Sequence, residues 1–269
     1  MTDLPVNITA VPSRLGSIAF IDERGLVVEI EDLRPEILHH GVVRISVLSF
    51  LVDVSAGVTL DIDPGSWTFT TDLSLRMPVR RAPDRATAST VILRQGGRSA
   101  HGLVEVVDGG RNLVAAGAIG FAHVARKPGD PPKPLVSPEM LVQRFSARER
   151  LSRPLREEAG IIPIDPEAGI VEIAVRPEVC NPAGTLQGAM VALVAEAATE
   201  DLIGTRAGHP AIVTDLDIRY LAQAKVGPVR TRARLLGNGP WDPVEISLID
   251  TATGRITTLA HARAVPAPD

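Results

Sequence analysis

Two glutamates are placed where a carboxylate could do chemistry. Glu196 and Glu200 lie inside or at the end of an otherwise apolar run, residues 189–203. They are four residues apart, so a helix would carry both on one face. Leu, Val and Ala residues around Glu196 would strip it of water and raise its pKa, which suits a general base or nucleophile. The alternative is that Glu196 lies on a solvated stripe and Glu200 on the ordinary surface of the helix end, because charged residues are seldom buried.

Two glycines precede the apolar runs of the chain. Gly188 comes before residues 189–203, and Gly41 comes before residues 42–57. If both runs are helices, these glycines lie at the helix N-termini, where free amides and the positive end of the dipole point outward. A substrate carbonyl can approach glycine closely, so such an amide could stabilise the oxyanion formed when a thioester is attacked. The alternative is that each glycine only makes the turn into its helix.

The sequence contains an internal duplication that relates these features. Residues 71–76 (TDLSLR) return in the second half as residues 214–219 (TDLDIR), and His40-Gly41 is matched there by Gln187-Gly188. The repeat is about half the chain, far longer than the roughly 20–50 residues of solenoid repeats, so we interpret it as a duplicated domain. We predict an N-terminal domain at 1–125, a Pro-rich linker at 126–136 and a C-terminal domain at 137–269.

Each copy shows the same order of elements. Residues 189–203 are rich in helix formers and predict a helix, whereas the β-branched residues 42–57 by themselves favour a strand. We predict a helix for 42–57 because its counterpart is one. Extended segments are expected at 25–30, 66–75, 85–94, 102–107 and 113–123, and at 170–175, 211–220, 229–236, 244–250 and 256–265. The fold class is therefore α+β, and a helix so apolar on all sides must be wrapped by its antiparallel sheet.

The residues before the second apolar run resemble a known family. Residues 181–188 (NPAGTLQG), with Glu196 eight residues further on, resemble hotdog-fold acyl-CoA thioesterases of the phenylacetate-pathway type, within the 4-hydroxybenzoyl-CoA thioesterase-like superfamily. Residues 213–221 also resemble the next strand of that family. The first copy matches through His40-Gly41 and the strand at Thr71. The whole chain therefore resembles a tandem double hotdog.

The resemblance implies roles for individual residues. In the second copy it places Glu196 at the catalytic carboxylate, Gly188 at the oxyanion amide and Asn181 at a loop amide. It places Thr214 at a hydroxyl position near the carboxylate. Gln187 departs from the family, which has His there.

The first copy keeps a different part of the family pattern. His40 and Gly41 match it. Aligning His40 with Gln187, however, puts Ser49 at the carboxylate position and pairs Asp53 with Glu200. The first copy therefore retains the helix start of the pattern but has lost the acid.

Helix geometry decides how these residues can be combined. Gly188 and Glu196 are eight residues apart, about 12 Å along a helix, so they cannot act on the same carbonyl. In the hotdog families that the chain resembles, the amide of one subunit meets the carboxylate of the other, so the resemblance implies that each site joins the two copies. We expect one active site and a second site that is degenerate or used only for binding, because it lacks the carboxylate unless Asp53 substitutes. The first combines His40, Gly41, Glu196, Glu200 and Thr214, and the second combines Asn181, Gln187, Gly188, Ser49 and Asp53.

The resemblance implies hydrolysis of an acyl-CoA thioester to the free acid and coenzyme A. Glu196 would act as base or nucleophile, which the sequence does not distinguish. Coenzyme A enters only as part of the substrate, and we expect no other cofactor and no metal, because the six His residues lack metal-ligand spacing. The alternative is a non-catalytic acyl-CoA or acyl-carrier-binding protein. A hotdog dehydratase is disfavoured because its Asp and His pair is missing.

Composition restricts the partners. The net charge of −4, from 28 basic and 32 acidic residues, disfavours nucleic acid. We see no signal peptide and no spanning segment, so no membrane partner is expected. The single Cys180 fits a reducing compartment, hence a cytoplasmic location. Apolar outer sheet faces predict a homo-oligomer, a dimer of double hotdogs.

Overall fold

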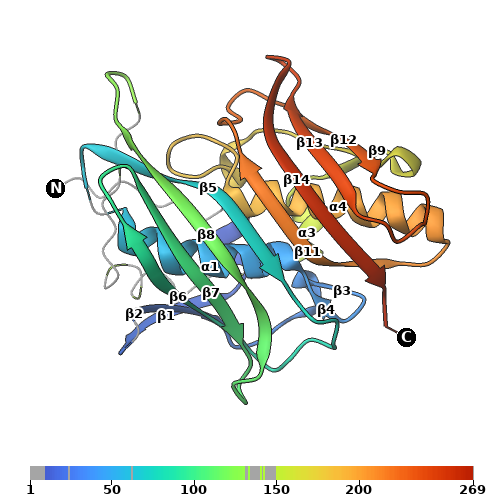
Figure 1. Ribbon diagram of the computed structural model, residues 1–269, viewed down its shortest axis with the longest axis horizontal. Helices are drawn as coiled ribbons and strands as arrows, with labels where there is room; N and C mark the ends of the chain where they lie inside the picture. The colour runs from blue at the N-terminus through green and yellow to red at the C-terminus, as the bar shows by residue number, and fades with distance from the viewer. Residues whose placement is uncertain are drawn as a thin grey trace.

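A long antiparallel sheet crosses the whole molecule, and two long helices lie on one side of it (Figure 1). The computed structural model describes residues 10–23, 25–61, 63–130, 133, 140, 142 and 150–268. The strand order is β1-β2-β6-β7-β8-β5-β11-β14-β13-β12-β10-β9. Strands of the first half therefore fill one end of the sheet, and strands of the second half fill the other.

The predicted strands are confirmed with boundary shifts of a few residues, and the long sheet gains two further strands at its ends, β1 and β9. The first half contains β1 (Ser17–Asp22), β2 (Gly25–Ile30), β5 (Ser66–Arg76), β6 (Ala86–Gln95), β7 (Ser99–Val107) and β8 (Leu113–Ala125). The second contains β9 (Ile162–Asp165), β10 (Ile170–Ile173), β11 (Ala211–Tyr220), β12 (Val229–Leu235), β13 (Val244–Asp250) and β14 (Arg255–Pro266). Part of the predicted linker, residues 131–132 and 134–136, lies outside the described residues.

The duplicated motif forms the seam between the halves. β5 pairs antiparallel with β11, so that Asp72 faces Arg219 and Arg76 faces Asp215. The guanidinium of Arg76 contacts the carboxylates of Asp215 at 3.0 Å and Asp217 at 2.6 Å. Each strand also has a register shift at the equivalent place, between Thr70 and Asp72 in β5 and between Val213 and Asp215 in β11. The two copies are thus related by an approximate two-fold axis through this pair.

Both predicted central helices form. α1 (Ile45–Leu60) packs against β2, β5, β6 and β7, and α4 (Gly188–Ala207) packs against β10 to β14. The two helices also pack against each other. α1 is helical despite its β-branched residues because nearly every side of it is buried, and burial outweighs the small difference in helix propensity.

The first helix begins later than its sequence indicated. Gly41 was expected at the start of α1, but it lies in the tight turn between β3 (Leu38–His39) and β4 (Val42–Val43). His40 and Gly41 have φ of 46° and 74° there. Gly184 has a matching φ of 72°, and it is the counterpart of Gly41 when the copies are aligned as they are at the seam, Thr71 with Thr214.

The alignment that pairs Thr71 with Thr214 at the seam therefore also holds for the two helices. Ile45 corresponds to Gly188, and Arg44 corresponds to Gln187, since each is the N-cap of its helix. The alignment of His40 with Gln187 was wrong by about one helical turn. Asp53, and not Ser49, is consequently the counterpart of Glu196.

Short helical segments complete the fold. They are η1 (Val11–Arg14), η2 (Pro35–Ile37), α3 (Leu155–Glu158), η3 (Pro166–Ala168) and η4 (Pro177–Val179). η2 and η4 precede the two central helices in equivalent positions and direct the chain toward each helix start.

Close packing of β8 against β5, one of the two seam strands, can be tested by substitution. A Cβ atom on Gly117 would lie 1.7 Å from the Ser74 carbonyl oxygen, so Gly117→Ala must displace one of the strands. We expect a loss of about 1–3 kcal/mol in the free energy of unfolding, the usual effect of overpacking. Urea denaturation measures it. Gly97→Ala is the control, because a Cβ atom there meets nothing within 4 Å; equal stability of the two variants would contradict the packing.

Candidate active site

Each central helix directs its N-terminus at a carboxylate of the other helix. The start of α1 faces Glu196 of α4, and the start of α4 lies beside Asp53 of α1. Both carboxylates are eight residues into their helices, as the two-fold relation requires. Each group of residues therefore combines side chains or backbone of both halves. We call them the Glu196 cluster (His39, Arg44, Ser46, Glu196, Glu200) and the Asp53 site (Asp53, Thr70, Gln187, Gly188, Tyr220).

The Glu196 carboxylate is fully engaged by the start of α1. One oxygen accepts a hydrogen bond from the Ile45 amide at 3.1 Å, and the other accepts one from the Ser46 hydroxyl at 2.5 Å. Arg44 Nη1 lies 3.7 Å away. Only 2% of Glu196 is exposed. Glu196 therefore caps α1 across the interface, since a carboxylate stabilises the free amides and dipole of a helix start.

The other members of this cluster are also buried and paired. Arg44 Nη1 donates to both oxygens of Glu200, at 2.9 and 3.1 Å, and His39 Nε2 lies 3.7 Å from the same carboxylate. Burial raises the pKa of Glu200 to about 8, with the charge of Glu196 adding to the effect and Arg44 opposing it. Burial, followed by the charge of Arg44, lowers the pKa of His39 to about 3. The donors that a substrate oxyanion would need are thus occupied by protein carboxylates.

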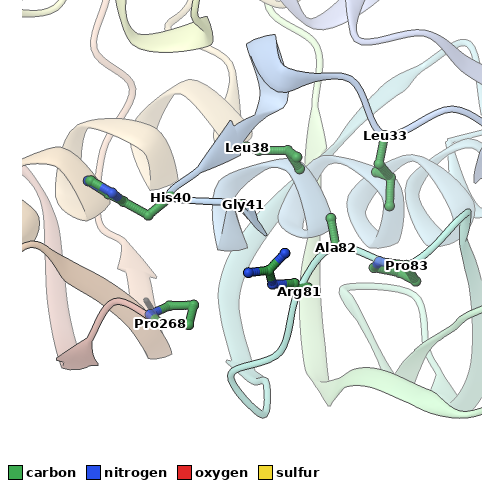
Figure 2. Close-up of a pocket in the computed structure, with 8 residues that line it drawn as sticks. All are labelled: Leu33, Leu38, His40, Gly41, Arg81, Ala82, Pro83 and Pro268. Atoms are coloured by element: carbon green, nitrogen blue, oxygen red, sulfur yellow. The ribbon is translucent and has the colours of Figure 1, made fainter.

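Three residues predicted beside Glu196 lie elsewhere. His40 is exposed, and its ring contacts His39 edge-on, with 4.5 Å between centroids. The Thr214 hydroxyl donates to Asp215 at 2.8 Å, and no bond to Glu196 is found among the described residues. His40 and Gly41 instead line a cavity of about 540 Å³. Figure 2 shows the His40 side chain pointing away from Arg81, which lines the same cavity.

The Asp53 site keeps a carboxylate that is only partly engaged. Asp53 Oδ1 accepts a hydrogen bond from the Thr70 hydroxyl at 2.5 Å. Burial raises the pKa of Asp53, although the Thr70 bond opposes the shift. Among the residues that the structure describes, no cation forms an ion pair with it, and its side chain remains partly exposed. Ser49, predicted for this site, donates instead to the Ile45 carbonyl within α1, at 2.8 Å.

Gln187 arranges the start of α4. Its Oε1 accepts hydrogen bonds from the amides of Ala189 at 2.6 Å and Met190 at 3.3 Å. Within the described part of the chain, the Gly188 amide has no hydrogen-bond acceptor. Asn181 accepts bonds from Ala183 and Thr185, at 3.0 and 3.2 Å, and so shapes the loop before the helix without contacting Asp53.

Gly188 leaves a recess beside Asp53. A Cβ atom there would lie 3.5 Å from Tyr220 Oη and 3.7 Å from Asp53 Oδ2. The backbone of Gly188 is helical, so no left-handed conformation requires glycine at this position. Glycine instead leaves space between its own amide, the Asp53 carboxylate and the Tyr220 phenol. All three residues are partly exposed. Such a recess can take a carbonyl oxygen or a water molecule.

Thr70 and Tyr220 were missed in the sequence. Thr70 directly precedes the repeated TDLSLR motif, and Tyr220 directly follows TDLDIR. Tyr220 is also the only tyrosine of the chain. If the alignment of the two motifs is extended to the helices, it pairs Asp53, and not Ser49, with Glu196. Thr70 and Tyr220 then follow as candidates because they flank the two aligned motifs.

Other kinds of site find little support in the described residues. No group of three or more His, Cys, Asp or Glu residues within them is arranged to hold a metal ion. Similarly, no helix within the described ranges combines the length and apolarity needed to cross a membrane.

Comparison with solved structures places the fold. A protein described as an oleoyl thioesterase from Lactobacillus plantarum superposes with a TM-score of 0.62 at 13% identity, over 90% of this chain and 95% of that one. An acyl-ACP thioesterase from Bacteroides thetaiotaomicron gives 0.55 at 10% identity, over 95% and 100%. A hotdog-fold protein of unknown function from Alicyclobacillus acidocaldarius gives 0.54 at 10% identity, over 99% and 100%. The chain therefore has the hotdog fold and resembles hotdog-fold thioesterases. No protein-family model and no curated protein sequence matches it.

The buried glutamate gives a pH-dependent test. Because the folded state raises the pKa of Glu200 from 4.5 to about 8, the folded protein binds this proton more tightly than the unfolded chain. This contribution to stability is present below about pH 4.5 and is lost as the pH rises toward 8. Glu200→Gln cannot ionise, so its unfolding free energy should fall less over this window. Urea unfolding at a series of pH values measures the difference. The exposed Glu105→Gln should keep the wild-type slope, and a wild-type slope in Glu200→Gln would contradict the assignment.

Proposed function

We propose that this protein hydrolyses an acyl-CoA thioester to the free acid and coenzyme A, and that the Asp53 site carries out the reaction. The recess at Gly188 is the observation that carries the proposal. Judged over the described residues alone, it brings an amide with no acceptor next to a carboxylate with no ion-pair partner. The resemblance to hotdog-fold thioesterases supports the reaction class.

The two halves contribute different parts to this site. We infer that each half is one hotdog unit, with boundaries near 1–125 and 137–269, so the chain is a tandem double hotdog. The order of strands, the paired seam and the equivalent helix starts support this. The first unit supplies Asp53 and Thr70, and the second supplies Gly188 and its cap, Gln187.

The Glu196 cluster is the rival location. Glu196 has the pattern of the family's catalytic acid, and the cavity beside His40 lies near the start of α1. However, Glu196 and Glu200 are only 2% and 6% exposed, and both are tied to Arg44 or to the start of α1. A substrate could reach these carboxylates only by breaking a buried ion pair. We therefore assign this cluster a structural role.

The chemistry of the Asp53 site follows from its groups. Asp53 removes a proton from a water molecule, whose oxygen attacks the thioester carbon while the carbonyl electrons move to oxygen. The Gly188 amide stabilises the resulting oxyanion. When the intermediate collapses, the C–S bond breaks, and the thiolate takes the proton from Asp53. Direct attack by Asp53, with an anhydride that water then hydrolyses, is the alternative route. Thr70 holds the carboxylate in place in either case.

Paired substitutions distinguish the two locations. Asp53→Asn should lower kcat by on the order of 10²–10⁴-fold, the contribution typical of a general base. Glu196→Gln should retain turnover but unfold more easily, because it loses an acceptor at the start of α1. Free-thiol release from a panel of acyl-CoA and acyl-carrier thioesters measures activity. Full activity of Asp53→Asn together with an inactive, folded Glu196→Gln would move the reaction to the Glu196 cluster. Tight binding of acyl-CoA without turnover by the wild type would identify a binding protein instead.

The recess itself can be filled. An added methyl at Gly188 would make only ordinary contacts of 3.5–3.8 Å, so Gly188→Ala should fold normally. Alanine is also the better helix former, by up to about 1 kcal/mol. We nevertheless expect kcat/KM to fall by on the order of 10²-fold, because the methyl displaces the reacting carbonyl. Gly204→Ala in the same helix is the matched control. Unchanged turnover in Gly188→Ala would show that no substrate atom uses the recess.

A further inference from the structure

The phenol of Tyr220 faces the same recess from the second half of the sheet. Tyr220 is the last residue of β11, one of the two seam strands. Its Oη lies 3.5 Å from where a Cβ atom of Gly188 would be, and Asp53 Oδ2 lies 3.7 Å from that point. Hydroxyl, carboxylate and amide therefore surround one small volume.

The present hydrogen bond of Tyr220 is easily exchanged. The hydroxyl donates to the Gly188 carbonyl at 3.2 Å, which is longer than the usual 2.7–2.8 Å of an O–H···O bond. That carbonyl, in the first turn of α4, is also the regular acceptor for the amide four residues later. The Gly188 carbonyl therefore still has a hydrogen-bond donor when the Tyr220 hydroxyl turns away from it. A stronger acceptor arriving in the recess can thus take the Tyr220 proton donor at little cost.

The neighbouring charge keeps the phenol protonated. Burial, followed by the carboxylate of Asp53, raises the pKa of Tyr220 well above its ordinary value of about 10. Asp53 can therefore be ionised while Tyr220 remains a neutral donor. Two adjacent groups whose pKa values differ widely can serve in one reaction, one as the base and the other as a hydrogen-bond donor.

The structure also shows why only one of the two equivalent places has this donor. With the copies aligned as at the seam, the counterpart of Tyr220 is Met77, which is 6% exposed and carries no hydroxyl. The counterpart of Thr70 is Val213, which is also buried. The Glu196 cluster thus lacks both hydroxyl groups that the Asp53 site contains.

We propose that Tyr220 is a catalytic residue that donates a second hydrogen bond to the thioester carbonyl oxygen, beside the Gly188 amide. This inference rests on the proposed hydrolysis at the Asp53 site. On substrate binding the hydroxyl rotates from the Gly188 carbonyl to the substrate oxygen. Tyr220 forms and breaks no covalent bond and keeps its proton throughout. Its contribution grows as negative charge develops on that oxygen in the transition state.

Tyr220→Phe tests the proposal, because it removes the hydroxyl and keeps the ring. We expect kcat to fall by on the order of 10²-fold, as for loss of one oxyanion donor, while KM changes by less than a few fold. The acid limb of the pH–rate profile should stay at its wild-type position, since Asp53 sets it. A role confined to stability would instead lower the unfolding temperature and leave kcat intact. Wild-type kcat in folded Tyr220→Phe overturns the proposal.

A second measurement does not depend on catalysis. Because Tyr220 is the only tyrosine, the phenolate absorbance of the whole protein reports its ionisation directly. We expect the titration midpoint to lie above 10 in the wild type and to move downward in Asp53→Asn, which removes the adjacent charge. An unchanged midpoint would show that the charge of Asp53 does not act on the Tyr220 phenol, and it would contradict their placement in one recess. Circular dichroism at each pH confirms that the protein remains folded.

The two hypotheses fail in different ways. If Asp53→Asn is inactive and Tyr220→Phe is fully active, the proposed hydrolysis stands and only the role of Tyr220 is rejected. If Asp53→Asn and the wild type hydrolyse every thioester alike, the assignment of the reaction to the Asp53 site is rejected, whatever Tyr220 does.

Discussion

Antiparallel pairing of β5 with β11 sets the position of everything that could react in this protein. The repeated motif pairs with its own copy, so the two halves are related by a two-fold axis through the centre of the sheet. That relation brings α1 and α4 into contact and points each helix start at the other helix. No helix can place its own ninth residue beside its own first amide, because about 12 Å separates them. Contact between the two helices removes this restriction.

The two equivalent places then differ because of their neighbours. At the start of α1, Arg44 supplies a cation to Glu196 and Glu200, so these buried carboxylates have a charged partner. At the start of α4, Gln187 supplies a neutral cap, and Asp53 is left without a cation among the described residues. The same backbone geometry therefore gives a closed ion pair in one place and a desolvated, accessible carboxylate in the other. The N-cap residue is Arg44 in the first place and Gln187 in the second.

Sequence reasoning failed at one specific step, and the reason is physical. Aligning the copies on His40-Gly41 and Gln187-Gly188 shifted α1 by nearly one turn of a helix. Residues four apart lie on the same face of a helix, so the shifted alignment still matched apolar positions with apolar positions. The apolar pattern therefore could not reveal the error. It put Ser49, which bonds within α1, where Asp53 belongs. The left-handed φ of Gly41 and Gly184, visible only in the folded chain, fixes the true correspondence.

The sequence by itself determined the duplication, the α+β class, the ten expected strands and the two buried helices. These depend on spacing and hydrophobic pattern, which are local properties. Only the tertiary structure decided which carboxylate has a cationic partner among the described residues. Whether Glu196 or Asp53 can react depends on which side chains meet them across the interface. Arg44, Ser46, Thr70 and Tyr220 approach these carboxylates from other elements of the fold, so no local pattern could reveal those contacts.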